Sequence, residues 1–341
     1  MSSTVLLTSL LLGSAFTPVP ECSAASRAAL HAEPVALEAS LRLEDERVRV
    51  VETAYDLQFE SIEATMNGGE VPAEFLPELE IEGAGERRLV VRDAPVGAAA
   101  GDGLLRSYEE VEGTESIYVA MGGEISEDEE ASASSVLAGE DLRFERQGDA
   151  FVARPEAALA ERLPDDLRFD LDLAGLLPDE PVAVGDEWSA PAAALDALRD
   201  PCGPGFWEWS ADLSGERQYD EVEEPTGTLD LTFESWVPEH EGRLARLTLT
   251  GGSSEGRTRP HDLEEIPVAE GPGTEAVLDT VDWRGEVVWD VVEGRLHSAD
   301  LTGDLTSEST VATTDDNPGP SFSSTVVLVG EIRLRSRVEA E

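Results

Sequence analysis

The sequence predicts an all-β protein, mainly antiparallel, in which curved sheets form a sandwich or an incomplete barrel with two short peripheral helices. Three observations support this prediction. Apolar and polar residues alternate with a period of two over much of the chain, which is typical of strands with one buried face. Turn sequences rich in Gly, Asn, Asp and Pro separate these runs. Only two short segments have the residue spacing of helices.

The alternation is clearest in the second half of the chain. Leu, Phe, Val or Trp occupy alternate positions in 227–237 and 244–250, which predicts a hairpin around a Pro-Glu-His-Glu-Gly turn. A second hairpin is expected from 287–291 and 295–301, which flank Glu-Gly. The last predicted strand, 321–335, is the longest of these, with its large apolar residues on even positions.

The first half of the chain shows the same pattern less strongly. The run 47–66 is rich in β-branched and aromatic residues and ends at Asn-Gly-Gly, a turn sequence. Shorter strands are expected at 89–92, 104–111, 116–121 and, as a hairpin, 142–153.

Two segments carry helix signals. In 155–163 a proline stands at the start, two leucines are four residues apart, and Pro164 follows as a stop. In 189–199 Ser189 is a candidate N-cap, and Pro201 follows the segment. Both are too short to form a layer, so they are expected to pack on a sheet.

The acidic and Ser-rich segment 124–135 is predicted to be a loop or linker between an N-terminal β region, 27–123, and a C-terminal β region, 136–341. All six tryptophans lie in the second region. The sequence leaves open whether the two regions form one continuous domain. Further loops are predicted at 251–260 and 313–320 because Gly, Ser, Asp and Pro accumulate there.

The N-terminus predicts a signal peptide over residues 1–25. The run 5–12, VLLTSLLL, is too short to cross a bilayer and suits a signal-peptide core. Cleavage after Ala15 or after Ala25 fits the small residues that precede each site, with Ala25 preferred. The residues before Cys22 are Val, Pro and Glu, which argues against lipid anchoring there. The mature chain is therefore expected to be exported, periplasmic or extracellular, without a transmembrane segment.

The composition excludes several classes of protein. With 24 basic and 73 acidic residues the formal net charge is −49, and every one of the basic residues is Arg. A charge this negative repels phosphate backbones and anionic lipid surfaces, so nucleic-acid binding is excluded and only loosely associated cations are expected. Codon bias and adaptation to salt both account for the missing Lys. The two cysteines, Cys22 and Cys202, are too few for a disulfide scaffold; whether they pair is open. No cofactor is expected.

The segment 176–188, which reads LLPDEPVAVGDEW, resembles a Leu-Pro-x(n)-Val-x-Val-Gly-Asp-x-Trp segment of exported, β-rich bacterial proteins that have no assigned activity. Two further stretches, 285–296 and 90–108, add to the resemblance. It implies export and a β-rich fold, and it implies no activity or site.

The Gly-Asp-x-Trp piece has a structural interpretation. Gly185 is expected in a turn conformation that residues with a Cβ avoid, and Asp186 can cap that turn through its carboxylate. Trp188 then covers the end of a sheet. A ligand contact at Trp188 is the alternative.

Trp207 and Trp209 are candidate ligand-binding residues. Two residues apart on a strand, their rings share a side and suit the stacking of a sugar. Core packing is the competing interpretation. Cys202, close by, has no basic neighbour in sequence to lower its pKa, so an inert or bridged thiol is expected rather than a nucleophile.

No catalytic set is recognisable. The segment 252–256 matches G-x-S-x-G around Ser254, and Asp282 and His297 follow in the order of a triad. The motif requires a helix directly after the serine, and no helix signal follows, so a Gly/Ser loop is the better interpretation.

Asp315, Asp316 and Asn317 are candidate calcium ligands, because they place oxygen donors ahead of a Pro-Gly turn. An ordinary solvated turn explains the same residues. No other metal site is expected, since the four His show no paired spacing.

The sequence thus supports an exported acidic protein that binds a protein, apolar or carbohydrate ligand, or has a structural role in the cell envelope or exterior, without catalysis. A hydrolase of extracellular polysaccharide or esters is the first alternative, motivated by the tryptophan pair and the excess of carboxylates. A calcium-dependent adhesion module is the second.

Overall fold

A computed structural model of the chain describes residues 34–39, 45–96, 103–147, 150–164, 167–169, 171, 173–211, 221–223, 225–240, 243–262, 272–314 and 321–339. The predicted signal peptide 1–25 with Cys22, and the calcium candidates Asp315, Asp316 and Asn317, lie outside the described residues.

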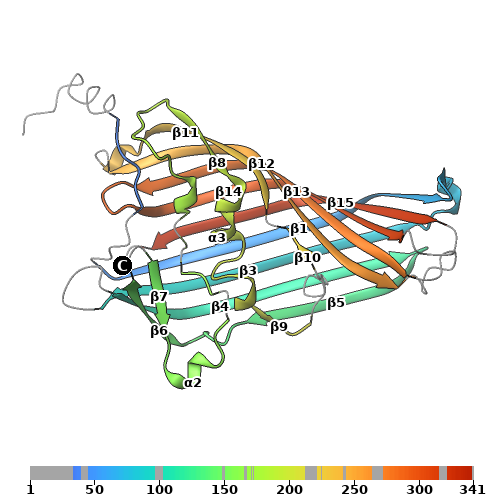
Figure 1. Ribbon diagram of the computed structural model, residues 1–341, viewed down its shortest axis with the longest axis horizontal. Coiled ribbons are helices and arrows are strands. Elements are labelled where there is room, and N and C mark those ends of the chain that lie inside the picture. The colour runs from blue at the N-terminus through green and yellow to red at the C-terminus, as the bar shows by residue number, and fades with distance from the viewer. Residues whose placement is uncertain are drawn as a thin grey trace, which may run out of the picture.

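The described strands form one antiparallel sheet of 15 strands (Figure 1). Along the sheet the order is β7-β6-β4-β3-β1-β15-β14-β13-β12-β11-β8, and β2, β5, β9 and β10 pair beside this path. The strands are β1 (Arg47–Met66), β2 (Gly69–Glu70), β3 (Leu79–Pro95), β4 (Gly103–Met121), β5 (Glu124–Ser134), β6 (Asp141–Gln147), β7 (Ala150–Arg154), β8 (Glu187–Pro191), β9 (Glu208–Trp209), β10 (Glu221–Val222), β11 (Thr226–Trp236), β12 (Leu244–Asp262), β13 (Pro272–Asp290), β14 (Arg295–Thr313) and β15 (Phe322–Glu339).

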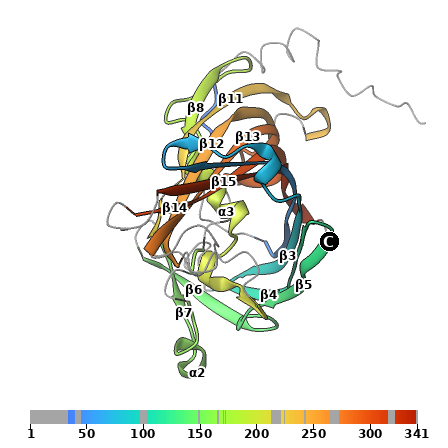
Figure 2. The same ribbon diagram turned by 90° about the vertical axis from the view of Figure 1, so that its right-hand side faces the viewer.

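The sheet is strongly curved and does not close. Its path ends at β7 and at β8, which do not pair with each other, and Figure 2 shows the strands curled around a segment that carries a short helix. The prediction of an antiparallel all-β fold is confirmed, and of its two forms the open barrel is the one observed.

Helices are short, as predicted; the first lies at the periphery, whereas the second lies inside the curve of the sheet (Figure 2). They are α2 (Ala157–Ala160) and α3 (Asp196–Arg199), accompanied by the 3₁₀ turns η1 (Ala73–Phe75), η2 (Ala174–Leu176), η3 (Ala192–Leu195), η4 (Pro204–Phe206) and η6 (Pro238–His240). The prediction that Ser189 is a helix N-cap was wrong. Ser189 lies in β8 and pairs with Asp230 of β11, and its hydroxyl donates to the Asp230 carboxylate at 2.7 Å. Pairing with a sheet edge thus delays the helical turns to Ala192.

Two predicted loops are strands. The acidic segment 124–135 is almost entirely β5, which pairs with β4, so one sheet continues from the N-terminal into the C-terminal region. Its buried residues are small, Ala131 and Ala133, while its acids are exposed along the sheet edge, which hides the alternation in the sequence. The Gly/Ser-rich segment 251–260 lies inside β12 and pairs continuously with β13.

Glycines allow the sheet to bend in β12 and β13. Gly251 has a φ of +147°, and a Cβ added there would lie 2.3 Å from the carbonyl oxygen of Thr228. Gly285, which has a φ of +155°, would bring a Cβ to 2.3 Å from the carbonyl oxygen of Asp300. Glycine kinks of this kind are a recognised device for curving a sheet. The bend makes one face of the sheet concave.

The main core fills one end of this concave face. There the segment 192–211, called the cover below, lies over the sheet and buries Leu198, Phe206 and Trp207 against it. The hydroxyl of Thr53 on β1 donates to the carbonyl of Leu198 at 2.9 Å, which fixes the position of α3 on the concave face. The long strands continue well past α3, towards the connection between β1 and β3 (Figure 1).

Candidate functional site on the concave face

Strand register identifies the side chains of the concave face beyond the cover. Thr53 faces the cover, so the odd positions that follow it in β1, Tyr55, Leu57 and Phe59, face the same way. A β-bulge between Phe59 and Ser61 shifts the alternation of side chains by one residue, so Ile62, at an even position, also lies on the concave face.

Eight half-buried apolar side chains share this face, and we call them the apolar stripe. Phe59 pairs with Leu328, Ile62 pairs with Val326, and the next strands continue the row. Among the described residues they belong to none of the hydrophobic core clusters. The members are Leu57, Phe59 and Ile62 of β1, Val326 and Leu328 of β15, Ile81 of β3, and Ile117 and Val119 of β4.

The dimensions of the stripe follow from strand geometry. From the row of Leu57 to the row of Ile62 it extends about 13 Å, four residues of β15 at roughly 3.3 Å each, because the bulge leaves one residue of β1 unpaired. From β4 to β15 it spans three strand spacings, about 14 Å at roughly 4.8 Å each. This surface is about as wide as it is long, and its apolar side chains suit the hydrocarbon part of a ligand.

A small cluster ends the stripe at the far end of the sheet. Ala64 of β1 and Phe322 of β15 are buried there, and Val71, Leu76 and Val311 pack against them. The stripe therefore lies between two packed regions, the main core under the cover and this end cluster.

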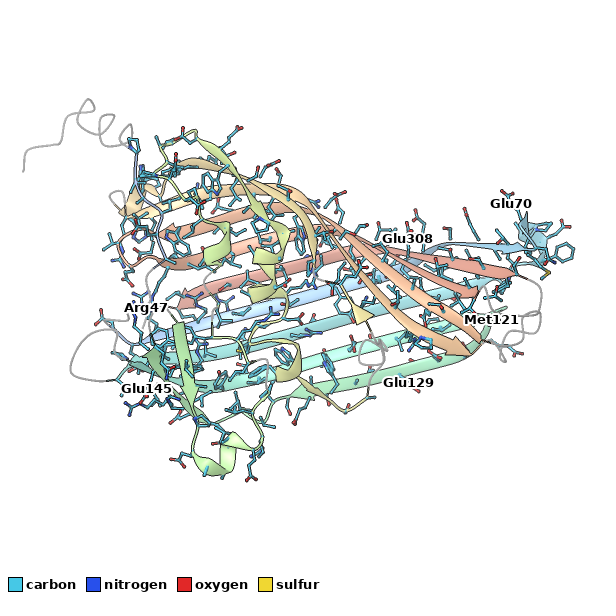
Figure 3. All side chains as sticks on the ribbon, in the orientation of Figure 1. Arg47, Glu70, Met121, Glu129, Glu145 and Glu308 are labelled. Atoms are coloured by element: carbon cyan, nitrogen blue, oxygen red, sulfur yellow. The ribbon has the colours of Figure 1, made fainter. Side chains whose placement is uncertain are left out.

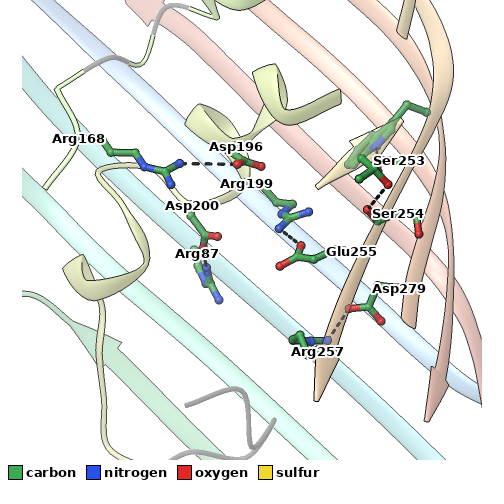
Figure 4. Close-up of polar contacts among 12 residues, drawn as sticks. Arg87, Arg168, Asp196, Arg199, Asp200, Ser253, Ser254, Glu255, Arg257 and Asp279 are labelled. Atoms are coloured by element: carbon green, nitrogen blue, oxygen red, sulfur yellow. Dashed lines mark hydrogen bonds and ion pairs between the residues drawn. The ribbon is translucent and has the colours of Figure 1, made fainter. Parts of the chain in front are cut away.

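Ion pairs lie on the concave face of β12 and β13, which β14 separates from the stripe. Arg199 of α3 pairs with Glu255, Arg257 with Asp279, and the guanidinium Nη2 of Arg259 lies 2.6 Å from Oε2 of Glu275. Figure 4 shows the first two pairs across β12, β13 and the cover. Their side chains are 12–24% exposed, so water screens them only partly.

The Arg199–Glu255 pair joins the cover to the sheet. Burial raises the pKa of the Glu255 carboxyl above its ordinary value, and the Arg199 guanidinium opposes this rise. Burial alone would lower the pKa of Arg199, but the nearby carboxylates, Glu255 first, raise it overall. The Arg199 guanidinium therefore favours the ionised form of the Glu255 carboxyl at this boundary.

A second polar contact holds the other side of the cover. Arg87 of β3 donates to Asp200 at 2.7 Å, and its guanidinium carbon lies 6.0 Å from the ring centre of Trp207 and 5.5 Å from that of Trp209. Trp207 is only 4% exposed. The predicted pair of tryptophans thus encloses an arginine at the core boundary, and Trp207 offers no free face for a sugar ring.

The Gly-Asp-x-Trp segment lies at the β8 edge of the sheet. Gly185 has a φ of +95°, and Oδ2 of Asp186 accepts the amide of Ala183 at 2.8 Å. Nε1 of half-buried Trp188 donates to the carbonyl of Leu176 at 2.8 Å. These contacts hold a turn in place; they lie apart from the apolar stripe.

Cys202, which belongs to the cover, is fully buried. Burial raises the pKa of its thiol to about 12, although Arg106 and Tyr108 act in the opposite direction. A thiol with this pKa is a poor nucleophile at neutral pH.

The triad candidates do not come together. Ser254 lies within β12 opposite Thr280, whereas His297 lies near the start of β14, beside the row that pairs Val288 with Ser298. The eight residues from Thr280 to Val288 along β13 separate those rows by about 26 Å. Asp282 adjoins the row of Ser254, so serine and histidine occupy different parts of the sheet.

Neither a cluster of metal ligands nor a membrane-spanning helix is found among the described residues. No group of three or more His, Cys, Asp or Glu side chains there is arranged to hold a metal ion. No helix in that part of the chain is long and apolar enough to cross a membrane.

The chain was compared with known proteins. No family model and no curated protein matches it. Solved structures include Pseudomonas aeruginosa OccK7 (OpdD), with 8% identity, a TM-score of 0.17, and coverage of 85% of this chain and 99% of that one. OpdQ of the same organism is 6% identical, with a TM-score of 0.15, and the match covers 85% of this chain and 99% of that one. OccK11 (OpdR) of Pseudomonas aeruginosa is 10% identical, with a TM-score of 0.11, and the match covers 88% of this chain and 100% of that one. Such TM-scores do not establish a shared fold, so they carry no functional argument.

Proposed function

We propose that this is an exported, non-catalytic binding protein, working in the periplasm or outside the cell, whose concave face holds an apolar ligand. The observation that carries the proposal is the apolar stripe: eight half-buried apolar side chains on the inner face of an open sheet, outside the core clusters among the described residues. The predicted signal peptide supports export.

The contrast between the two faces supports a ligand on the concave side. Opposite the stripe, the convex positions of β1 and β3 are Asp56, Gln58, Glu80 and Glu82, all exposed. The convex positions Val327 and Val329 of β15 are half-buried apolar residues, so the contrast applies to β1 and β3, whose polar outer face needs no partner. Apolar surface that stays partly exposed on the inner face is stabilised by covering it, at roughly 25 cal/mol per Å² of area removed from water.

The apolar lining and the charges on the same face indicate the ligand class. The apolar side chains of the stripe suit a hydrocarbon chain, and the ion pairs of β12 and β13, beyond β14 on the same face, offer charged groups to a polar head. We therefore propose a single-chain amphipathic lipid, such as a long-chain fatty acid or a monoacyl lipid. The placement of Trp207 under Arg87 gives no support to the alternative of a polysaccharide hydrolase.

Titration with a fluorescent long-chain fatty acid tests the proposal. The wild-type protein should bind it in the micromolar range or tighter, and Leu328→Asp should weaken binding at least tenfold because a charge then lies in the path of the chain. Val329→Asp is the matched control: it is the next residue of the same strand, is also half-buried, and faces the convex side.

The control also separates binding from folding. Melting temperatures of both variants establish that the sheet persists, and Leu57→Trp, which fills the stripe without adding charge, provides a second blocked variant. Equal loss of affinity in Leu328→Asp and Val329→Asp, or no saturable binding by the wild type, refutes the proposal.

A further inference from the structure

The far end of the sheet carries an exposed apolar tip, defined as Phe75, Met121 and Ile125. Their exposed fractions are 72%, 52% and 61%, and they are three of the six large hydrophobic residues that are exposed among the described residues. Scattered exposed apolar residues are ordinary, but a group of them at one place marks a contact surface.

The two segments of the tip lie next to each other. Leu79 of β3 pairs with Met121 of β4, and the amide of Gly122 donates to the carbonyl of Glu78 at 2.9 Å. Figure 3 labels Met121 and Glu70 at this same end of the molecule. The β1–β3 connection, which carries Phe75, and the β4–β5 turn, which is flanked by Met121 and Ile125, therefore form one surface.

The tip is held from beneath. Val71 and Leu76, on either side of η1, pack on Ala64 and Phe322 in the end cluster, so Phe75 is presented outward from a packed base. The same cluster closes the apolar stripe. Apolar side chains thus continue from the stripe through the end cluster to the tip.

The charges around the tip restrict its partner. Segments 66–80 and 119–127 contain no Arg or Lys, whereas Glu70, Glu74 and Glu124 are exposed there. These carboxylates repel an anionic lipid surface and also repel the same tip of a second copy of this chain. A neutral surface with an apolar interior carries no such penalty.

We infer that the tip docks on a zwitterionic lipid surface, into which Phe75, Met121 and Ile125 insert. This inference rests on the proposed function for its choice of a lipid rather than a protein, because a carrier of acyl chains must meet a lipid surface. The tip lies at the end where the stripe terminates, which gives the chain a short apolar path between surface and stripe.

Vesicle flotation tests the inference. The full chain is mixed with phosphatidylcholine vesicles and, separately, with vesicles containing phosphatidylglycerol. The wild type should float with the first and less with the second. The triple variant Phe75→Ser, Met121→Ser, Ile125→Ser should lose at least about tenfold in binding to phosphatidylcholine, because three large apolar groups no longer insert.

Val292→Ser is the control, since Val292 is 74% exposed in the turn between β13 and β14, away from the tip. It should bind vesicles like the wild type. The inference is overturned if the wild type does not float, if Val292→Ser loses as much binding as the triple variant, or if anionic vesicles bind better. It is also overturned if light scattering shows that the wild type is a dimer and the triple variant a monomer, because the tip then joins two copies.

Fatty-acid titration of the same variants keeps the two proposals apart. The triple variant should retain the affinity of the wild type within about twofold, because the stripe is intact. Flotation without fatty-acid binding contradicts the proposed function alone, and fatty-acid binding without flotation contradicts the docking site alone.

Discussion

Neighbouring glycines in β12 allow a sharp test of how the sheet is bent. Gly251 has a φ of +147°, and a Cβ there would lie 2.3 Å from the carbonyl oxygen of Thr228 and 2.8 Å from Cα of Leu229, both backbone atoms of β11. Gly251→Ala therefore forces β11 and β12 apart or changes the bend. Gly252 is the matched control, because a Cβ there would meet nothing closer than Oδ1 of Asp282 at 3.6 Å.

The expected magnitude follows from two costs. A residue with a side chain held at such a φ costs about 1–3 kcal/mol, and an unrelieved clash with packed neighbours costs about 1–3 kcal/mol more. Gly251→Ala should thus lower the free energy of unfolding by roughly 2–6 kcal/mol, a large part of the roughly 5–15 kcal/mol typical of a domain. Gly252→Ala should change it by less than about 1 kcal/mol, since alanine restricts the unfolded chain without a clash.

Urea denaturation monitored by circular dichroism and tryptophan fluorescence measures both variants. The reasoning is refuted if the two substitutions have equal effects, or if Gly251→Ala leaves the midpoint of unfolding unchanged. Either result means that the bend does not depend on the missing Cβ at Gly251.

Three further predictions concern the cover and the β8 edge. In a chain that lacks its other cysteine, Cys202 should resist a thiol reagent at pH 8 until urea unfolds the protein; rapid labelling of the folded state would contradict a buried thiol with a pKa of about 12. The raised pKa of Glu255 means that the folded state binds its proton more tightly, so this carboxyl contributes less stability as the pH rises above about 4.5. The free energy of unfolding of Glu255→Gln relative to the wild type should therefore increase over that range. Loss of the ion pair with Arg199 lowers the stability of the variant by a constant amount and does not change this slope. Urea titrations at several pH values that give the opposite slope would disprove it. Trp188→Phe should cost about 1 kcal/mol in urea denaturation, because the bond to the carbonyl of Leu176 is lost, and an unchanged midpoint would argue against that bond.

The two-residue period was sufficient to predict the long strands. In β11 and in the second half of β15 one face packs in the core and the other meets water, so the alternation is visible in 227–237 and at the end of 321–335. Burial of one face is a local property of a strand, so it produces an alternation of apolar and polar residues that is visible in the sequence.

The two segments that were predicted as loops, in β5 and β12, are strands without a clear alternation of apolar and polar residues. β5 buries only small residues such as Ala131 and Ala133, and the acids along it suit a sheet edge that must not pair with other molecules. In β12 the polar residues of the concave face find partners on distant elements: Ser253 accepts the indole of Trp283 at 2.9 Å, and Glu255 pairs with Arg199. Such long-range pairs leave no periodic signal.

The apolar stripe was beyond sequence reasoning for a related reason. Its members come from four strands, and the bulge between Phe59 and Ser61 breaks the period that would place Ile62 with its neighbours. The sequence instead drew attention to tryptophans, of which Trp207 is part of the core. Only the register across β4, β3, β1 and β15 assembles the stripe.

Photo-cross-linking with a diazirine-bearing long-chain fatty acid tests the central claim most directly, because it reports where the chain lies. Peptide mapping of the labelled protein should place the adducts on the inner positions of β1 and β15, around Phe59 and Leu328, and an excess of unlabelled fatty acid should suppress them. Adducts confined to the convex face or to the cover, or labelling that no competitor reduces, would contradict the claim that the concave face is a binding site.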